Sequence, residues 1–362
     1  MMPTYKSIEI SQAFHASGNA QSDNILFDDI LDVRSPAEYA DDHLPGAINV
    51  PVLNNEERAR IGTLYSQVSP FEAKKQGAVL IARNIARHVE ESFGDRQKSW
   101  RPLIYCWRGG MRSGAMAHIL AQIGWKSNQL EGGYKAYRRS VITALETLPI
   151  KFNFCVINGS TGSGKSHLLE ALAAQGAQVL DLEKLAQHRG SLLGKLPDQP
   201  QPTQKTFETR LWDALHAFTP ERPIYIEAES RKVGALSVPT ALHERMRESA
   251  CVRVEVPQEA RVALLMHDYA HFLQNPALLA ERLSLLVELH GRVVIDRWCE
   301  MAKQSEWEPL VEALLTQHYD PAYKRSSGAS FPQLNNAQVL RFHALDAETL
   351  RKAAENLIGN ER

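Results

Sequence analysis

The sequence predicts an α/β protein built from two parallel-sheet units, the second of which continues into a helical C-terminal part. Short apolar runs alternate with helical patterns over residues 25–145, and this alternation is typical of a parallel sheet. A further apolar run, residues 150–158, leads into a glycine-rich loop and another helix, and much of the chain from residue 258 onward reads as helical. A chain of 362 residues is long for one hydrophobic core. We therefore place two domains, at residues 14–145 and 150–362.

The composition is that of an ordinary globular protein, with 44% hydrophobic residues and a net charge of −1. This charge provides no overall attraction to nucleic acid or to an anionic membrane, so a nucleic-acid partner would need a local basic face. No apolar stretch approaches the roughly 18 residues of a membrane span, and the N-terminus lacks an apolar signal core. We expect no membrane contact and a cytoplasmic location. The four cysteines are widely separated, which argues against a zinc site or a disulfide framework.

The first unit is predicted to alternate strands and helices. A strand at 25–34 precedes a short helix from Ser35 to Tyr39, which the proline at its first turn favours. Asp32 and Arg34, at the end of that strand, are expected to form a structural ion pair rather than to act in catalysis. The remaining elements are a strand at 47–51, a charged helical region at 54–97, strands at 102–105 and 126–130, a helix at 113–123, and a glycine turn at 131–134 followed by a helix through Ala144.

The centre of this unit is the loop that follows the strand 102–105. Because the loop joins a strand to a helix N-terminus, its backbone N–H groups and the helix dipole place partial positive charge at its centre. That charge favours the thiolate of Cys106. We predict that Cys106 is a catalytic nucleophile, with a buried structural cysteine as the alternative. The predicted anion-binding loop comprises Arg108, Gly109, Gly110, Arg112 and Ser113.

Four signatures in this unit resemble a rhodanese domain: residues 32–34, 43–51, the Cys106 loop and 131–133. The resemblance implies that the loop cysteine carries sulfur or selenium as a persulfide-type adduct. Cys106 and Arg112 have a C-x5-R spacing, however, which is one residue longer than the usual sulfurtransferase loop. The cysteine phosphatases share this spacing, and their arginine grips phosphate through two hydrogen bonds. A longer loop suits a larger anion or a larger chalcogen.

The second unit begins with the strand 150–158, which runs directly into a G-x-x-x-x-G-K-S motif. The strand before the motif and the apolar helix after it are the context of a phosphate-binding loop in a P-loop NTPase-like fold. The backbone would wrap phosphate oxygens, Lys165 would add a point charge, and the Ser166 hydroxyl could ligate Mg²⁺. The predicted phosphate-binding residues are Gly159, Ser160, Thr161, Gly162, Ser163, Gly164, Lys165 and Ser166.

Two acidic residues follow strands expected beside this loop. Asp181 follows the apolar run 178–180, and Glu227 ends the strand 224–226. Carboxylates at such strand ends can manage a metal-bound water or a leaving group, although either residue could equally be a helix cap or a surface charge. No metal ligand is assigned with certainty. Residues 188–191 could contact a ligand anion, and the remaining prediction is a strand at 252–256 with helices at 258–273, 276–290, 292–303, 307–317 and 346–357.

The fusion of these two units resembles the bacterial tRNA 2-selenouridine synthases. The strings that carry the resemblance lie at 106–113, 131–136, 181–183, 188–191, 227–231 and 319–323. The resemblance implies a transferase of selenium-containing groups, which replaces sulfur with selenium from selenophosphate in 2-thiouridine at the wobble position of tRNA. It also implies geranyltransferase activity, because this family uses geranyl diphosphate to S-geranylate the thiouridine and so makes the sulfur a better leaving group.

The predicted residues suit this chemistry, and we divide it as a hypothesis: selenation at Cys106, and prenyl transfer at the phosphate loop with Lys165 and a Mg²⁺ ion at Ser166. The tRNA would present a splayed-out anticodon base. A protein that supplies selenophosphate is a further conceivable partner, and the oligomeric state stays open. Basic residues that could contact tRNA phosphates, each of which could instead be a solvated surface charge, are Lys135, Arg138, Arg139, Arg231, Lys232, Arg245 and Arg247.

Two rival functions remain open from the sequence. A cysteine phosphatase fused to a kinase-like domain would hydrolyse a phosphomonoester at the C-x5-R loop, and it would turn over phosphate esters or ATP without tRNA. A non-catalytic protein would only sense a ligand through its rhodanese-like unit, and it would bind RNA without modifying it. The intact Cys106 and the Lys165–Ser166 pair argue against the second rival.

Overall fold

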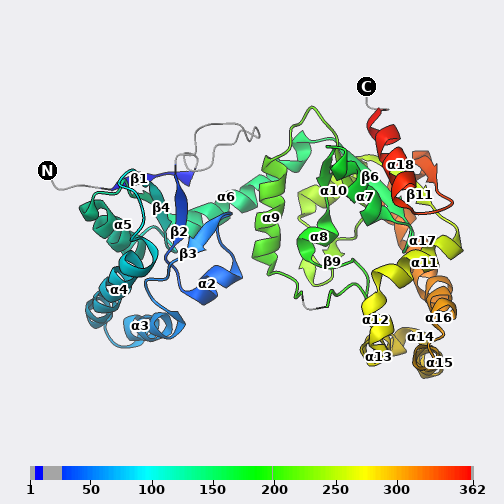
Figure 1. Ribbon diagram of the computed structural model, residues 1–362, viewed down its shortest axis with the longest axis horizontal. Helices are drawn as coiled ribbons and strands as arrows, with labels where there is room; N and C mark the ends of the chain where they lie inside the picture. Colours follow the sequence, from blue (N-terminus) through cyan, green and yellow to red (C-terminus); the bar gives the residue numbers. More distant parts are fainter. Residues whose placement is uncertain (1–4, 11–26, 198, 360–362) are drawn as a thin grey trace. The chain divides into compact units, whose positions relative to one another are not determined.

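The computed structural model describes residues 5–10, 27–197 and 199–359 (Figure 1). The predicted domain start at 14 and the first two residues of the strand predicted at 25–34 lie outside the described residues. Packing divides the chain into two compact units: residues 1–145 with 203–217, and residues 146–202 with 218–362. The segment 203–217 therefore packs with the first unit, whereas the domains predicted from the sequence place it in the second.

The α/β class is confirmed, and each unit contains a parallel five-stranded sheet. In the first unit the strand order is β1 (Lys6–Ile8), β5 (Asn128–Leu130), β4 (Pro102–Tyr105), β2 (Asp29–Asp32) and β3 (Ala47–Asn49). The strands are short and almost fully buried at their centre, where Leu31 and Ile104 pack against Met116 and Leu120. The helices of this unit are α2 (Pro36–Asp41), α3 (Asn55–Gln67), α4 (Pro70–Ser92), α5 (Met111–Ile123), α6 (Gly133–Thr147) and α9 (Gln204–His216).

Helix α9 was not predicted from the sequence. Thr203 caps it by accepting a hydrogen bond from the Thr206 backbone N–H. Its buried face carries apolar side chains at helical spacing, including Phe207 and Leu211. The Trp212 ring packs edge-on against the Tyr137 ring of α6, with 5.5 Å between centroids. A long-range contact of this kind, rather than local propensity, assigns α9 to the first unit.

In the second unit the strand order is β12 (Gln338–Arg341), β11 (Ala250–Glu255), β6 (Phe154–Gly159), β8 (Ile224–Glu227) and β7 (Gln178–Leu180), all parallel. Strand β6 is central, so the loop at its carboxyl end lies among the ends of its neighbours. Helices α7 (Lys165–Ala174) and α18 (Ala347–Gly359) share one hydrophobic cluster with β6 and β11. The unit also contains α8 (Leu182–Ala186), α10 (Thr240–Glu248), the hairpin β9 (Lys232–Val233) with β10 (Leu236–Ser237), and 3-10 turns at Pro149–Lys151 and Pro332–Asn336.

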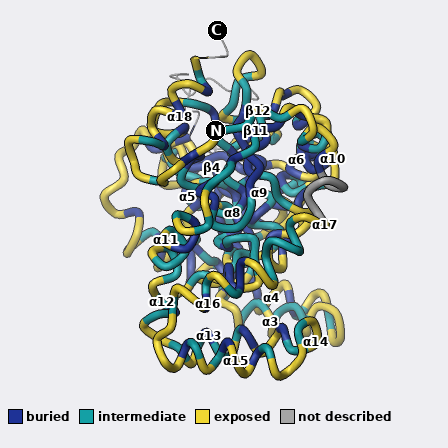
Figure 2. Tube along the Cα trace, turned by 90° about the vertical axis from the view of Figure 1, so that its right-hand side faces the viewer, coloured by how far each residue is buried: buried dark blue, intermediate teal, exposed yellow. Residues whose placement is uncertain are grey.

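The predicted helical part follows β11, with shorter helices than expected. The stretch predicted as one helix at 258–273 forms α11 (Gln258–Asp268) and α12 (Ala270–Gln274), and the stretch at 276–290 forms α13 (Pro276–Ser284) and α14 (Val287–His290). Then come α15 (Arg292–Lys303) and α16 (Trp307–Leu314), a π-helical turn (Leu315–Tyr319) and α17 (Asp320–Ser330). Buried and exposed positions alternate along α15, as an amphipathic surface helix requires (Figure 2). Among the described residues, no helix is long and apolar enough to cross a membrane.

Candidate active sites

The Cys106 loop lies between β4 and the N-terminus of α5, as predicted. The Cys106 Sγ accepts hydrogen bonds from the Gly110 backbone N–H at 3.3 Å and from the Ser113 hydroxyl at 3.2 Å. Burial alone would raise the pKa of the Cys106 thiol. Hydrogen bonding from Ser113 and the positive charge of Arg112 outweigh burial, and the pKa lies below its ordinary value. The loop therefore favours the nucleophilic thiolate.

Two glycines allow this loop to close against the turn at residues 131–133. Gly109 and Gly133 both adopt positive φ values, +63° and +55°. A Cβ at Gly109 would lie 2.6 Å from the Leu130 carbonyl oxygen, and one at Gly133 would lie 2.3 Å from the Cys106 carbonyl oxygen. The same Cys106 carbonyl accepts a hydrogen bond from the Tyr134 backbone N–H at 2.9 Å. Gly109 and Gly133 thus form part of the wall behind Cys106.

Gln129 is a site residue that the sequence analysis missed. Its Nε2 donates to the Gly109 carbonyl at 2.7 Å and to the Ser113 hydroxyl oxygen at 2.8 Å. Because Ser113 accepts from Gln129, its own proton is directed at the Cys106 sulfur. Gln129 lies in a strand of only three residues, and no sequence pattern marks it.

The two loop arginines differ in their surroundings. The guanidinium of Arg112 binds the Glu38 carboxylate at 2.8 and 3.4 Å, so its hydrogen-bonding edge faces a protein carboxylate. Arg108 is exposed beside Trp107, whose ring packs on that of Tyr134 with 5.3 Å between centroids. An anion at the loop would compete with Glu38 for Arg112.

The Asp32–Arg34 pair has the structural place expected for it. Both side chains are fully buried, and the closest contact between them is 2.6 Å. Tyr105 donates its hydroxyl proton to Asp32 at 2.7 Å, and the Arg34 guanidinium lies 4.0 Å from the centre of the Tyr134 ring. The pair therefore connects three segments of the wall behind the Cys106 loop: β2, the end of β4 and the start of α6.

The phosphate loop lies between β6 and α7, as predicted. Two of its residues, Gly162 and Gly164, adopt positive φ values of +77° and +79°. Lys165 donates to the Gly159 carbonyl at 2.9 Å, so its ammonium group folds back over the loop. The hydroxyl of Ser163 is buried without a hydrogen-bonding partner. A glycine-rich loop at a helix N-terminus, with a lysine held over it, is suited to bind phosphate oxygens.

Of the two predicted carboxylates, Asp181 is a helix cap. Its Oδ1 accepts a hydrogen bond from the Lys184 backbone N–H at 2.7 Å, at the start of α8. Glu227, by contrast, is 1% exposed at the end of β8, and only one of its oxygens is hydrogen-bonded, to the Glu183 backbone N–H at 2.7 Å. Burial, together with the charges of Asp181 and Glu183, raises the pKa of Glu227 well above its ordinary value.

Glu183 and Glu229, rather than the two predicted carboxylates, line the cleft at the phosphate loop. This cleft has a volume of about 400 Å³. The Ser166 hydroxyl donates to Glu183 Oε2 at 3.3 Å. Burial raises the pKa of Glu183, and burial together with the nearby Glu183 charge raises the pKa of Glu229 to about 8. Glu183 and Glu229 each lie two positions after a predicted residue, Asp181 or Glu227. The direction of the chain as it leaves each strand decides which carboxylate of each pair faces the loop.

An ion pair between a buried arginine and a half-buried aspartate supports the same loop. Arg261 donates to the Thr161 carbonyl at 2.9 Å and pairs with Asp320 at 2.6 Å. Arg189, which the sequence analysis proposed as an anion contact, lines the cleft with its guanidinium 4.7 Å from the centre of the Tyr269 ring. The neighbouring His188 is buried and does not line this cleft. No group of three or more histidine, cysteine or acidic side chains placed to hold a metal ion occurs in the part of the chain that the structure describes.

The predicted basic residues divide into two sets. Arg138 and Arg245 have partners within the protein: Arg138 pairs with Glu208 of α9, and Arg245 donates to the Phe152 carbonyl at 3.0 Å. Arg247 is half-buried and has interactions of its own. The residues that remain exposed for an external phosphate are Lys135, Arg139, Arg231 and Lys232.

Comparison with known proteins places the chain in a family. Residues 16–140 match the rhodanese-like domain, and residues 152–286 match the tRNA 2-selenouridine synthase AAA domain. The chain is 32% identical over 332 residues to a tRNA 2-selenouridine synthase of Marinobacter nauticus, an alignment that covers 83% of this chain and 89% of that protein. The chain belongs to the tRNA 2-selenouridine synthase family.

Other relatives in this family align over less of their length. The chain is 35% identical over 260 residues to the tRNA 2-selenouridine synthase of Nitrosomonas europaea, covering 70% of this chain and 66% of that protein. It is 34% identical over 255 residues to that of Bdellovibrio bacteriovorus, covering 66% and 64%. The chain thus spans just under two thirds of the length of these two relatives. The matched AAA region contains the phosphate loop and the carboxylates of Glu183, Glu229 and Asp268 that line its cleft.

Proposed function

We propose that this protein converts 2-thiouridine at the wobble position of tRNA to 2-selenouridine through an S-geranylated intermediate. The observation that carries the proposal is the pairing, in one chain of this family, of a thiolate-stabilising loop with a phosphate loop. The relatives are tRNA 2-selenouridine synthases, which indicates the overall reaction. The two loops suit two different steps, one with a cysteine nucleophile and one with a phosphate-containing substrate. We assign prenyl transfer to the phosphate loop and selenation to the Cys106 loop.

Prenyl transfer requires a diphosphate leaving group to be stabilised. The thiocarbonyl sulfur attacks C1 of geranyl diphosphate, the C1–O bond breaks, diphosphate departs with the bonding pair, and the base loses its N3 proton. Lys165 and the backbone N–H groups of the loop would stabilise the departing diphosphate. A Mg²⁺ ion would supply further neutralising charge. The Ser166 hydroxyl with Glu183 and Glu229 suits one, because Mg²⁺ prefers a hydroxyl and carboxylates beside substrate phosphates.

Selenation then exchanges the activated sulfur for selenium. Overall, S-geranyl-2-thiouridine, selenophosphate and water give 2-selenouridine, geranyl thiol and phosphate, with no net oxidation or reduction. Selenophosphate resembles phosphate in shape and charge, and the Cys106 loop offers it backbone donors and two arginines. The Cys106 thiolate, stabilised by Ser113, would attack the phosphorus of selenophosphate and release hydroselenide, which displaces geranyl thiolate from C2 of the base. Water then hydrolyses the S-phosphocysteine to phosphate and the free thiol.

Incubation with thiolated tRNA, geranyl diphosphate and selenophosphate, followed by mass spectrometry of the nucleosides, tests this function. We expect 2-selenouridine when all three substrates are present, and S-geranyl-2-thiouridine when selenophosphate is withheld. Unmodified thiouridine in both reactions would contradict the proposal. Turnover of a generic phosphate ester or of ATP without tRNA would instead favour the phosphatase or kinase alternative.

A further inference from the structure

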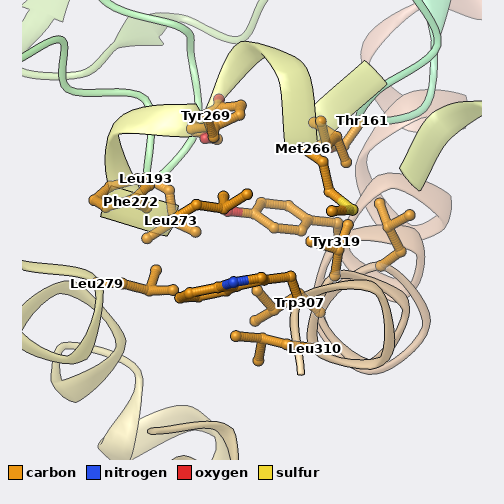
Figure 3. A pocket seen from close by; sticks show the side chains of 15 residues that line it. Thr161, Leu193, Met266, Tyr269, Phe272, Leu273, Leu279, Trp307, Leu310 and Tyr319 are labelled. Atoms are coloured by element: carbon orange, nitrogen blue, oxygen red, sulfur yellow. The ribbon is translucent and has the colours of Figure 1, made fainter. Parts of the chain in front are cut away.

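An apolar pocket lies next to the phosphate cleft, in the helical part of the second unit. It is formed by α11, α12, α13, α16 and the π-helical turn. Figure 3 shows the Tyr319 ring across its centre, with Thr161 and Met266 above it and Trp307 and Leu310 below it. The other side chains that line it are mostly aliphatic or aromatic, including Phe272. The sequence predicts only helices in this region.

The pocket and the phosphate cleft share a rim. Thr161 of the phosphate loop lines both, so the apolar space begins directly beside the phosphate-binding backbone. Tyr319 also lines both, and it ends a π-helical turn, a form of helix that occurs often at functional sites. The remaining shared residues are Ser191, Leu265 and Tyr269. A single ligand can therefore reach from one space into the other.

The lining decides which kind of ligand fits. Charged side chains, amides and histidines are absent from the pocket lining, and the residues that carry hydroxyl groups lie on the rim shared with the phosphate cleft. Beyond that rim, most hydrogen-bonding groups of a nucleoside would lose water without gaining partners. A hydrocarbon chain pays no such cost and gains from burial. The pocket volume is about 60 Å³, several times the roughly 10–15 Å³ that one water molecule needs. It admits a short chain, and the wider cleft beside it accommodates the part nearest the diphosphate.

We infer that this pocket is the binding site for the hydrocarbon chain of a prenyl diphosphate whose diphosphate occupies the phosphate loop. The inference rests on the proposed function, which makes geranyl diphosphate a substrate, and it adds the site of the chain and the residues that select its length. Val311 and Leu273 line the side of the pocket and are half-buried. Trp307 and Leu310 lie on the side away from Thr161 (Figure 3) and limit the length of chain that fits.

Equilibrium binding to the full-length protein tests the inference with four probes: inorganic diphosphate, ADP, geranyl diphosphate and farnesyl diphosphate. For the wild-type protein we expect geranyl diphosphate to bind about tenfold or more tightly than diphosphate, and ADP to bind no more tightly than diphosphate. Val311→Trp fills the pocket and should abolish the advantage of the geranyl chain while leaving diphosphate affinity unchanged. Val293→Trp is the matched control, because Val293 is 84% exposed on α15 and outside the pocket.

Trp307→Leu provides an independent variant that enlarges the pocket. It should raise the affinity for farnesyl diphosphate relative to geranyl diphosphate by several-fold. Equal binding of diphosphate and geranyl diphosphate to the wild-type protein, or an undiminished chain advantage in Val311→Trp, would overturn the inference. The inference would also be overturned if Val311→Trp lowered the affinity for ADP more than the affinity for geranyl diphosphate.

The nucleoside assay separates this inference from the proposed function. A chain advantage that Val311→Trp removes, without any geranylated nucleoside from the wild-type protein, supports the pocket and refutes the function. Geranylated nucleoside whose formation and chain preference are unchanged by Val311→Trp supports the function and refutes the pocket.

Discussion

The two loops of this protein have the same backbone plan and opposite electrostatic states. Each joins a parallel strand to a helix N-terminus and depends on glycines at positive φ. At the first loop, the Ser113 hydroxyl and the Gly110 backbone N–H donate hydrogen bonds to the Cys106 sulfur, and Gln129 donates to Ser113, so the loop favours a thiolate. At the second, Glu183 and Glu229 crowd carboxylates beside Lys165, and their pKa values are raised.

This difference shows how one design serves two reactions. The Cys106 loop lowers the pKa of its own thiol and so favours the nucleophilic thiolate. The phosphate loop has Lys165 at a helix N-terminus and two neighbouring carboxyl groups with raised pKa values, so it is prepared to bind a ligand that brings negative charge with it. The apolar pocket adjoins the phosphate loop in the second unit. An apolar space beside a phosphate-binding loop suits an amphiphilic substrate.

Removing the positive charge of Lys165 at the phosphate loop should have the largest effect on activity. In Lys165→Ala we expect geranylation of thiolated tRNA to fall by about 100-fold or more, because the departing diphosphate loses its main counter-charge. Selenation of tRNA that is supplied already S-geranylated should persist in the same variant. Lys303→Ala, which removes a surface lysine of α15, is the control. Loss of both reactions to the same degree would remove the contrast between the loops.

Neutralising Glu229 should change how the stability of the protein depends on pH, and this tests the raised pKa values at the phosphate loop. The pKa of Glu229 is raised to about 8 in the folded protein, above its ordinary value of 4.5. Between these two pH values the folded protein keeps a proton on Glu229 that the unfolded chain releases. The contribution of Glu229 to the free energy of unfolding is therefore lost as pH rises from the lower value to the higher. Glu229→Gln should lessen the fall in melting temperature between pH 6 and pH 9 by a few degrees.

The exposed Glu300→Gln is the control for this experiment, and it should follow the wild-type protein. Glu183 and Glu227 also have raised pKa values, so part of the pH dependence should remain. Identical pH dependence in Glu229→Gln and the wild-type protein would show that the carboxylate is not protonated at neutral pH.

At the Cys106 loop, Ser113→Ala should raise the pKa of the thiol. The variant loses a hydrogen bond that stabilises the thiolate, and we expect the pKa of the Cys106 thiol to rise. Thiolate absorbance during a pH titration, taken as the difference from Cys106→Ala, measures it. Ser140→Ala removes a hydroxyl from α6 that bonds the Tyr137 carbonyl, and it should leave the titration unchanged. An unchanged pKa in Ser113→Ala would show that the charge of Arg112 and the backbone suffice.

The smallest effect is expected at Glu38, which pairs with Arg112. Glu38→Gln releases the guanidinium toward the loop, and the affinity for phosphate as a probe of selenophosphate should rise a few-fold. Competition by phosphate against selenophosphate in the nucleoside assay measures it. Glu57→Gln, at a helix cap of the same unit, is the control. A fall in affinity would indicate that Glu38 positions Arg112 instead of competing for it.

The sequence predicted the features that depend on local pattern. The glycine-rich strings, the strands before them and the helices after them identified both loops, and the spacing around Asp32 and Arg34 was enough to predict their ion pair. Helix α9 carried a usable signal in the spacing of Phe207 and Leu211, but it follows a proline-rich loop and was overlooked. Its packing with the first unit depends on Tyr137 and could not be read from local sequence.

Other features depended on contacts between distant segments. Glu183 and Glu229 were within the strings that the sequence singled out, yet Asp181 and Glu227 were chosen. The direction of each chain as it leaves the sheet determines which carboxylate faces the loop. Gln129 contacts the Cys106 loop from another strand. The apolar pocket needs segments between residues 161 and 319 to converge, and no periodicity within one helix reveals such convergence.

The division of labour between the two loops is tested most directly by nucleoside mass spectrometry on Cys106→Ala, with thiolated tRNA, geranyl diphosphate and selenophosphate all present. Cys299→Ala, a half-buried cysteine of α15, serves as the control. We predict that Cys106→Ala forms S-geranyl-2-thiouridine at the wild-type rate and accumulates it, with no 2-selenouridine. Loss of the geranylated nucleoside together with the selenated one, while Cys299→Ala makes both, would contradict the account.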